Sequence, residues 1–156
     1  MKIAVRFVTE LALIAALALC AVVSAGCMFD GYSTRDRVTF AARQYNEDVR
    51  WGRFLQAAAH VPKERKDRFL EQHKNLDDDL EIADYDMTGI EIDKSDKKHE
   101  KITAHVDYTW TLKSTGLVRK TSTTQEWEEK DGNWYMAKEE RVKGTPLALF
   151  DEPAHK

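Results

Sequence analysis

Two polar side chains on one predicted strand, His105 and Asp107, have the residue types and the spacing of an acid–base pair. Residues two apart in a strand point to the same face, so the imidazole and the carboxylate would lie side by side. That face alternates with the apolar face that carries Tyr108 and Trp110, and the polar face of an antiparallel sheet commonly meets solvent. The pattern favours a solvated pair, and we assign no catalytic residue.

A second set of residues is suited to line an internal pocket: Tyr45, His73, Tyr85 and Trp110. His73 falls on the inner stripe of a predicted helix, where an imidazole would exchange a proton near neutral pH. The three aromatic rings would supply apolar walls, although the same rings also suit an ordinary core. Together they predict a site for a small apolar ligand.

No stretch of the sequence has the spacing of a metal or cofactor site. The histidines and cysteines do not match a zinc pattern, and the acidic residues 77–86 fail as a calcium loop because Ser95 stands where a bidentate Glu is required. A glycine-rich phosphate loop and a nucleophile elbow are also missing from the sequence. We therefore expect no metal and no cofactor.

Helical periodicity dominates the chain between residues 33 and 75. The first helix is predicted from Ser33 to about Gly52, and shorter helices over residues 54–60 and from Pro62 to about Asn75. Arg50 and Arg53, at the end of the first helix, would complement its dipole or bind an anion. The first helix has an apolar stripe at helical spacing, made of Val38, Ala41, Ala42, Tyr45 and Val49.

Beyond residue 79 the apolar residues alternate with a period of two, which is typical of strands. The first alternating stretch changes parity twice, which predicts a bulge near Thr88-Gly89. Asp131-Gly132-Asn133 predicts a tight hairpin between the last two strands. Four antiparallel strands are predicted, over residues 80–92, 102–112, 117–129 and 134–142.

Helices followed by bent strands and a closing hairpin, Trp127 to Trp134, resemble the cone-shaped α+β fold of the nuclear transport factor two-like superfamily over Ser33 to Val142. The resemblance implies N-terminal helices packed against a curved sheet, often with a pocket in the cone. Catalytic members use Asp, His or Tyr inside the cone, but their arrangements do not match this sequence. The stretch Tyr45 to Phe54, with Pro62 and Phe69, also resembles a group of proteobacterial lipoproteins, which implies a location and no activity.

The first 26 residues resemble the leader of a bacterial lipoprotein. A basic start, with Lys2 and Arg6, precedes an apolar run, Leu11 to Val23, of the length of a signal-peptide core. Ala25-Gly26-Cys27 resembles the lipobox, whose cysteine is acylated and becomes the new N-terminus; Ser24 departs from its usual Leu, Val or Ile. An ordinary cleaved signal and an uncleaved anchor helix are the alternatives, and all three place the domain outside the cytoplasm.

This leader divides the chain into a signal peptide (1–26), a lipidated Cys27 with its tether (27–32), an α+β domain (33–143) and a tail (144–156). Met28, in place of the Asp that retains lipoproteins in the inner membrane, implies the outer membrane. Cys20 would leave with the leader and Cys27 would carry palmitate. The mature domain then has no thiol, so packing and not disulfides must stabilise it.

The net charge of −3, with no basic patch interleaved with aromatics, argues against nucleic-acid binding. We expect a lipid-anchored protein in the cell envelope, facing the periplasm, whose domain is a binding or interaction module. Its expected partners are the membrane, a second copy or another envelope protein, and a small apolar ligand. One alternative is an enzyme that uses the cone pocket with Tyr45 and His73. The other is an assembly subunit that pairs through a sheet face with Thr109, Thr111 and Thr123.

Overall fold

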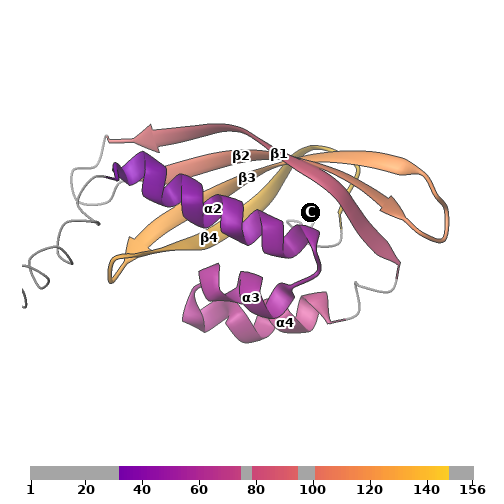
Figure 1. The fold of residues 1–156 in the computed structure, drawn as a ribbon, viewed down its shortest axis with the longest axis horizontal. Helices are drawn as coiled ribbons and strands as arrows, with labels where there is room; N and C mark the ends of the chain where they lie inside the picture. The colour runs from indigo at the N-terminus through magenta and orange to yellow at the C-terminus, as the bar shows by residue number, and fades with distance from the viewer. Residues whose placement is uncertain (1–31, 75–78, 95–100, 148–156) are drawn as a thin grey trace, which may run out of the picture. The chain divides into compact units, whose positions relative to one another are not determined.

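The computed structural model describes residues 32–74, 79–94 and 101–147 (Figure 1). Within them the chain forms α-helices α2, α3 and α4 followed by one four-stranded antiparallel sheet, so the predicted α+β class is confirmed. The predicted leader helix, Cys27 and the end of the tail lie outside the described residues. No helix among the described residues is long and apolar enough to cross a bilayer.

Helix α2 (Thr34–Arg50) forms where its apolar stripe predicts it, and that stripe is buried. The helix ends because Gly52 adopts a left-handed φ of 64°, which glycine tolerates without strain. The amides of Gly52 and Arg53 then donate to the carbonyls of Val49 and Asp48, at 3.1 and 2.8 Å. This pairing is a Schellman motif, and it turns the chain sharply into α3.

The next two predicted helices are present, but part of each is a 3₁₀-helix. Helix α3 (Phe54–Ala57) continues as a 3₁₀ turn over Ala58–His60, and α4 (Lys66–His73) is preceded by a 3₁₀ turn over Lys63–Arg65. Pro62 separates the two regions, since it has no amide hydrogen to donate within a helix.

The sheet follows chain order, with strands β1 (Leu80–Asp93), β2 (Lys101–Leu112), β3 (Val118–Lys130) and β4 (Asn133–Gly144). Asp131 and Gly132 both have positive φ, 53° and 76°, as a type I′ turn requires. The predicted hairpin is therefore confirmed.

Bulges bend both edge strands. In β1 the pairing register skips Ala83 and Thr88, so the predicted bulge is confirmed and a second one precedes it. In β4 the register skips Ala137 and Val142, which the sequence pattern did not predict. Because a bulge reverses the parity of the residues that follow, the skip at Ala137 turns Glu139 to the inner face.

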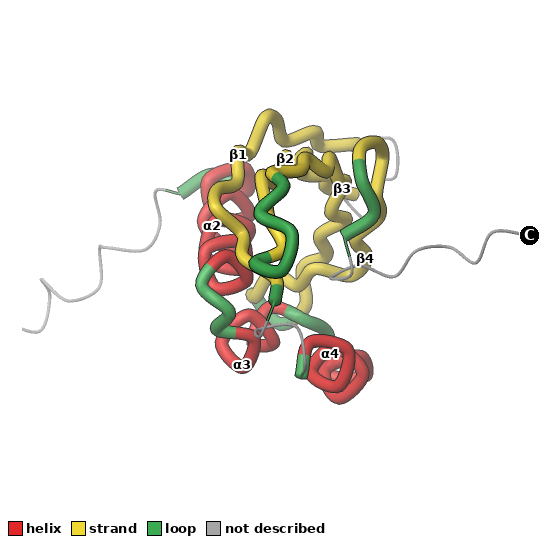
Figure 2. Tube along the Cα trace, turned by 90° about the vertical axis from the view of Figure 1, so that its right-hand side faces the viewer, coloured by secondary structure: helices red, strands yellow, loops and turns green. Residues whose placement is uncertain are grey.

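The inner face of the sheet packs against α2, and both edge strands contact that helix (Figure 2). Trp110, Trp127 and Trp134 all lie in this core, and Trp127 is fully buried. The sheet therefore curves around α2, and its bulges supply the bending.

Candidate functional site

Six buried polar side chains meet between α2 and the sheet; we call them the Glu139 cluster. Helix α2 contributes two of them, β2 one, β3 two and β4 one. Each is less than a tenth exposed, which is unusual for such residues unless they bond to one another. The members are Tyr45, Asn46, Tyr108, Thr123, Gln125 and Glu139.

The carboxylate of Glu139 accepts hydrogen bonds from four of these side chains. The hydroxyl of Thr123 and the amide nitrogen of Gln125 donate to it at 3.0 and 2.9 Å. The hydroxyls of Tyr45 and Tyr108 donate to it at 3.2 Å each. Burial raises the pKa of Glu139 from 4.5 to about 7, against the opposing effect of these hydrogen bonds. The carboxyl therefore exchanges its proton near neutral pH.

Asn46 and Gln125 complete the cluster. The Asn46 amide donates to the Ala42 carbonyl at 2.8 Å and to Gln125 Oε1 at 3.1 Å, and the Gln125 amide donates back to Asn46 Oδ1 at 2.8 Å. The Tyr108 hydroxyl also contacts Asn46 Oδ1. Because one hydroxyl has a single proton, Tyr108 can donate to Asn46 when Glu139 is neutral and to Glu139 when it is ionised.

Burial, followed by the charge of Glu139, raises the pKa of both Tyr45 and Tyr108 well above the ordinary tyrosine value. Both phenols therefore stay protonated and act as donors. Arg65 donates to the carbonyl of Ala137, the residue that β4 bulges out. This contact gives the carbonyl of the bulged residue a donor from outside the sheet.

The four residues predicted to line a pocket do not converge on one space. Tyr45 belongs to the Glu139 cluster, and the Tyr85 hydroxyl donates to the Arg43 carbonyl at 3.2 Å at the edge of the sheet. The Trp110 indole donates to Thr121 Oγ1 at 2.8 Å. Each of these three aromatic side chains thus has its own partner within the protein.

His73, the fourth predicted residue, is buried on α4 as expected. Its ring lies between Phe54 and Phe69, with centroid separations of 4.8 and 4.0 Å. Its Nδ1 lies 2.5 Å from the Phe69 carbonyl oxygen. Phe69 also contacts Tyr45, at 6.3 Å between centroids, and this is the link between His73 and the Glu139 cluster.

The predicted acid–base pair lies on the outer face of the sheet. His105 Nε2 is 3.2 Å from Glu91, and Asp107 stands opposite Asp86 in the register. The prediction that Thr123 shares this exposed face with Thr109 and Thr111 is wrong. Thr123 has the opposite parity from the outer residues of β3, and it is buried against Glu139.

A groove of about 390 Å³ lies where α2 ends; we call it the α2-end groove. It combines apolar side chains with a few charged ones, and its volume falls within the usual range of small-molecule sites. It is lined by Val49, Arg50, Trp51, Gly52, Phe54, Leu80, Glu81, Ile82 and Lys113.

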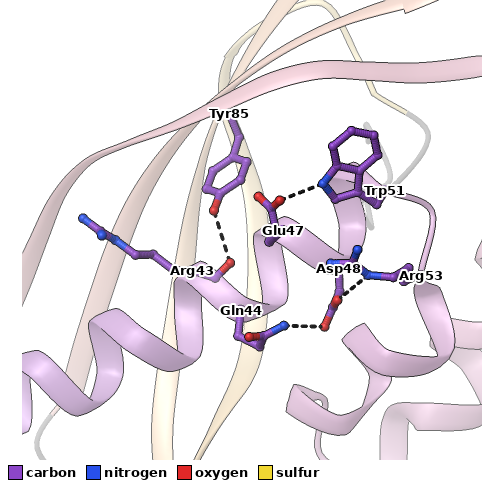
Figure 3. A network of polar contacts seen from close by, with 7 residues as sticks. All are labelled: Arg43, Gln44, Glu47, Asp48, Trp51, Arg53 and Tyr85. Atoms are coloured by element: carbon purple, nitrogen blue, oxygen red, sulfur yellow. Dashed lines mark hydrogen bonds and ion pairs between the residues drawn. The ribbon is translucent and has the colours of Figure 1, made fainter.

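Trp51 is an exposed wall of this groove, and Figure 3 shows its ring beside Glu47. Its ring is 60% exposed, yet its indole N–H donates to Glu47 at 2.7 Å and the Arg50 guanidinium lies 5.3 Å from its centroid. Arg50 also approaches Asp84 of β1 at 3.4 Å. These contacts give the exposed ring two partners on the protein surface.

An ion pair with one buried partner, Asp48, lies at the same end of α2. Asp48 is nearly inaccessible, and it accepts from Arg53 Nε at 2.8 Å and from Gln44 at 3.2 Å (Figure 3). Arg53 therefore forms an ion pair with Asp48. Arg50 stacks near Trp51 and forms an ion pair with Asp84. Both arginines bond to the protein around the helix end.

Within residues 32–74, 79–94 and 101–147, no three His, Cys, Asp or Glu side chains come together as a metal site. A scan against protein-family models and searches of curated proteins and solved structures gave no match. Sequence reasoning missed Glu139 and Gln125. One feature of the sequence pointed to a change in β4, namely that apolar residues stop alternating after Met136. A charged and exposed strand end would produce the same pattern.

Proposed function

We propose that this chain is a lipid-anchored envelope protein whose α+β domain is a binding module. The anchor is supported by the leader and by Ala25-Gly26-Cys27. Met28 after that cysteine supports the outer membrane, with the domain facing the periplasm. The thiol-free sequence after Cys27 agrees with a domain stabilised by packing alone.

The cone-like form of the fold belongs to this proposal. It is supported by long strands that are bulged at both sheet edges and by the contacts of both edge strands with α2. Because bulges bend their strands, a sheet that is bulged at both edges can curve around the helix. The α2-end groove is made where α2 meets the first residues of β1.

The observation that carries the binding role is the exposed Trp51 beside the apolar floor of the α2-end groove. A rigid aromatic ring offers contact area at a low cost in conformational entropy. Val49, Leu80 and Ile82 extend this apolar surface, while Arg50 and Lys113 provide polar groups. The groove fits a small ligand with a flat apolar part.

A groove-filling substitution tests this role. We expect aromatic fragments to shift the indole N–H resonance of Trp51 in the wild-type protein held in lipid nanodiscs, and not in Leu80→Trp, whose new ring would occupy the groove. Trp51→Phe identifies the resonance. Leu117→Trp adds the same ring at an exposed turn and should leave the shifts intact. Equal shifts in Leu80→Trp, or none in the wild type, would reject the groove as the binding site.

One observation favours an enzyme instead, namely a buried carboxyl with a pKa of about 7 beside two tyrosines. In the described structure its four donors already bind it, and Trp127 fills the neighbouring core. A reacting group would have to displace these contacts. The cluster is thus better suited to holding α2 on the sheet, and binding remains our proposal.

A further inference from the structure

The exposed face of the first half of α2 combines an uncovered aromatic ring with basic side chains. Phe40 is 72% exposed, although it lies between the buried residues Val38 and Ala41. At helical spacing from it, Arg37 precedes and Arg43 follows, both exposed. We call Arg35, Asp36, Arg37, Phe40 and Arg43 the α2 surface patch; Asp36, four residues before Phe40, lies on the same side of the helix.

From this patch we infer that α2 contacts the membrane surface, with Phe40 entering the headgroup region. The inference rests on the proposed lipidation of Cys27. Thr34 is seven residues after Cys27, so the chain between them spans at most about 25 Å. Phe40 lies only about 9 Å further along the helix axis, at 1.5 Å per residue. A lipid at Cys27 therefore keeps the α2 surface patch close to the bilayer.

The charges of the α2 surface patch suit contact with a membrane surface. Between Thr34 and Gln44 there are three arginines and one acidic residue, Asp36, in a chain of net charge −3. Part of the hydrogen-bonding capacity of Arg37 is taken up within the protein, because it donates to Glu129 at 2.9 Å and to the Gly132 carbonyl at 3.0 Å. Arg35 and Arg43 still exceed Asp36 in charge, and arginine binds lipid phosphates well. Phe side chains on interfacial helices insert at the boundary between the lipid headgroups and the acyl chains.

Contact through the first half of α2 also keeps the α2-end groove accessible. The helix has 17 residues and is therefore about 25 Å long, with the tether at its start and the groove at its end. A helix that meets the membrane near Phe40 and tilts away leaves Trp51 in the aqueous phase. The bilayer would then orient the domain with its groove toward the periplasm.

Nitroxide accessibility tests this contact on the full chain. Phe40→Cys and Leu55→Cys are each labelled and placed in vesicles of phosphatidylcholine and phosphatidylglycerol. Leu55 is a matched control because it is 73% exposed and lies beyond the groove end of α2. We expect collisions with a water-soluble nickel complex to be roughly threefold rarer at position 40 than at position 55, and collisions with oxygen to be more frequent, as for a side chain inserted at the interface.

Equal nickel accessibility at the two positions would overturn the membrane contact. Shielding of position 40 from both nickel and oxygen would also overturn it, because that result indicates a protein neighbour such as a second copy. The protein without either new cysteine tests the lipidation of Cys27 separately. An acylated Cys27 has no thiol, so nitroxide uptake by this protein would reject the lipidation, whatever the two variants show.

Discussion

Glu139 is expected to remove about 3 kcal/mol of unfolding free energy as the pH rises from 4.5 to about 7, because it holds its proton more tightly in the folded protein. The folded pKa is raised, so the folded state favours the neutral carboxyl. This contribution is fully present below pH 4.5 and is lost as the pH passes the folded pKa of about 7. Urea unfolding at a series of pH values measures it.

Glu139→Gln should remove this loss, because an amide cannot ionise. The substitution can be accommodated since three of the four donors around Glu139 are hydroxyls, which can rotate and accept. Glu140→Gln is the matched control. The carboxylate of Glu140, the residue next to Glu139, pairs with Lys138 at 2.7 Å, and its removal should leave the wild-type pH dependence in place. Burial lowers the pKa of His60, which acts in the opposite direction, so the difference between wild type and Glu139→Gln isolates Glu139.

Two results would contradict this description of the cluster. One is an identical pH dependence in Glu139→Gln and the wild type. The other is a wild-type stability that rises, relative to Glu139→Gln, between pH 4.5 and 7. Either would mean that Glu139 is ionised at neutral pH in the folded protein.

Trp127→Ala is expected to destabilise the domain by about 4 kcal/mol, the usual cost of removing a large buried aromatic side chain. Trp127 is fully buried, and it meets Tyr45 and His60 edge-on at centroid distances of 6.0 and 6.4 Å. Its indole nitrogen has no hydrogen-bond partner in the described structure, so the loss is one of packing. Urea unfolding followed by circular dichroism measures the change.

Trp51→Ala provides the matched control for Trp127→Ala. Trp51 is 60% exposed, and its removal deletes one surface hydrogen bond to Glu47, so a cost of about 1 kcal/mol or less is expected. Similar costs for the two substitutions would contradict a core built around Trp127. They would instead indicate an interior open enough to tolerate a cavity.

The elements that local pattern determines were predicted well. The stripe of α2, the parity change near Thr88 and the Asp131-Gly132 turn are each set by neighbours in sequence. The predicted ends of the strands differ from the observed ones by one or two residues, because the last pairs of a ladder depend on the partner strand.

The Glu139 cluster could not be predicted in this way. Glu139 turns inward because β4 bulges at Ala137, whose carbonyl accepts from Arg65, 72 residues away in the chain. A charged residue near a strand end otherwise indicates solvent exposure. The α2-end groove has the same origin, since Trp51 and Leu80 meet only after the sheet has folded onto α2.

Lipidation of Cys27 is the central claim, and labelling with palmitate in growing cells tests it most directly. We expect the wild-type protein to incorporate the label and to fractionate with membranes, because the acyl chains would be attached at its new N-terminus. Cys27→Ala should incorporate none, and Cys20→Ala should be labelled like the wild type, since Cys20 lies within the proposed leader. Label retained by Cys27→Ala, or missing from the wild type as well, would contradict the anchor.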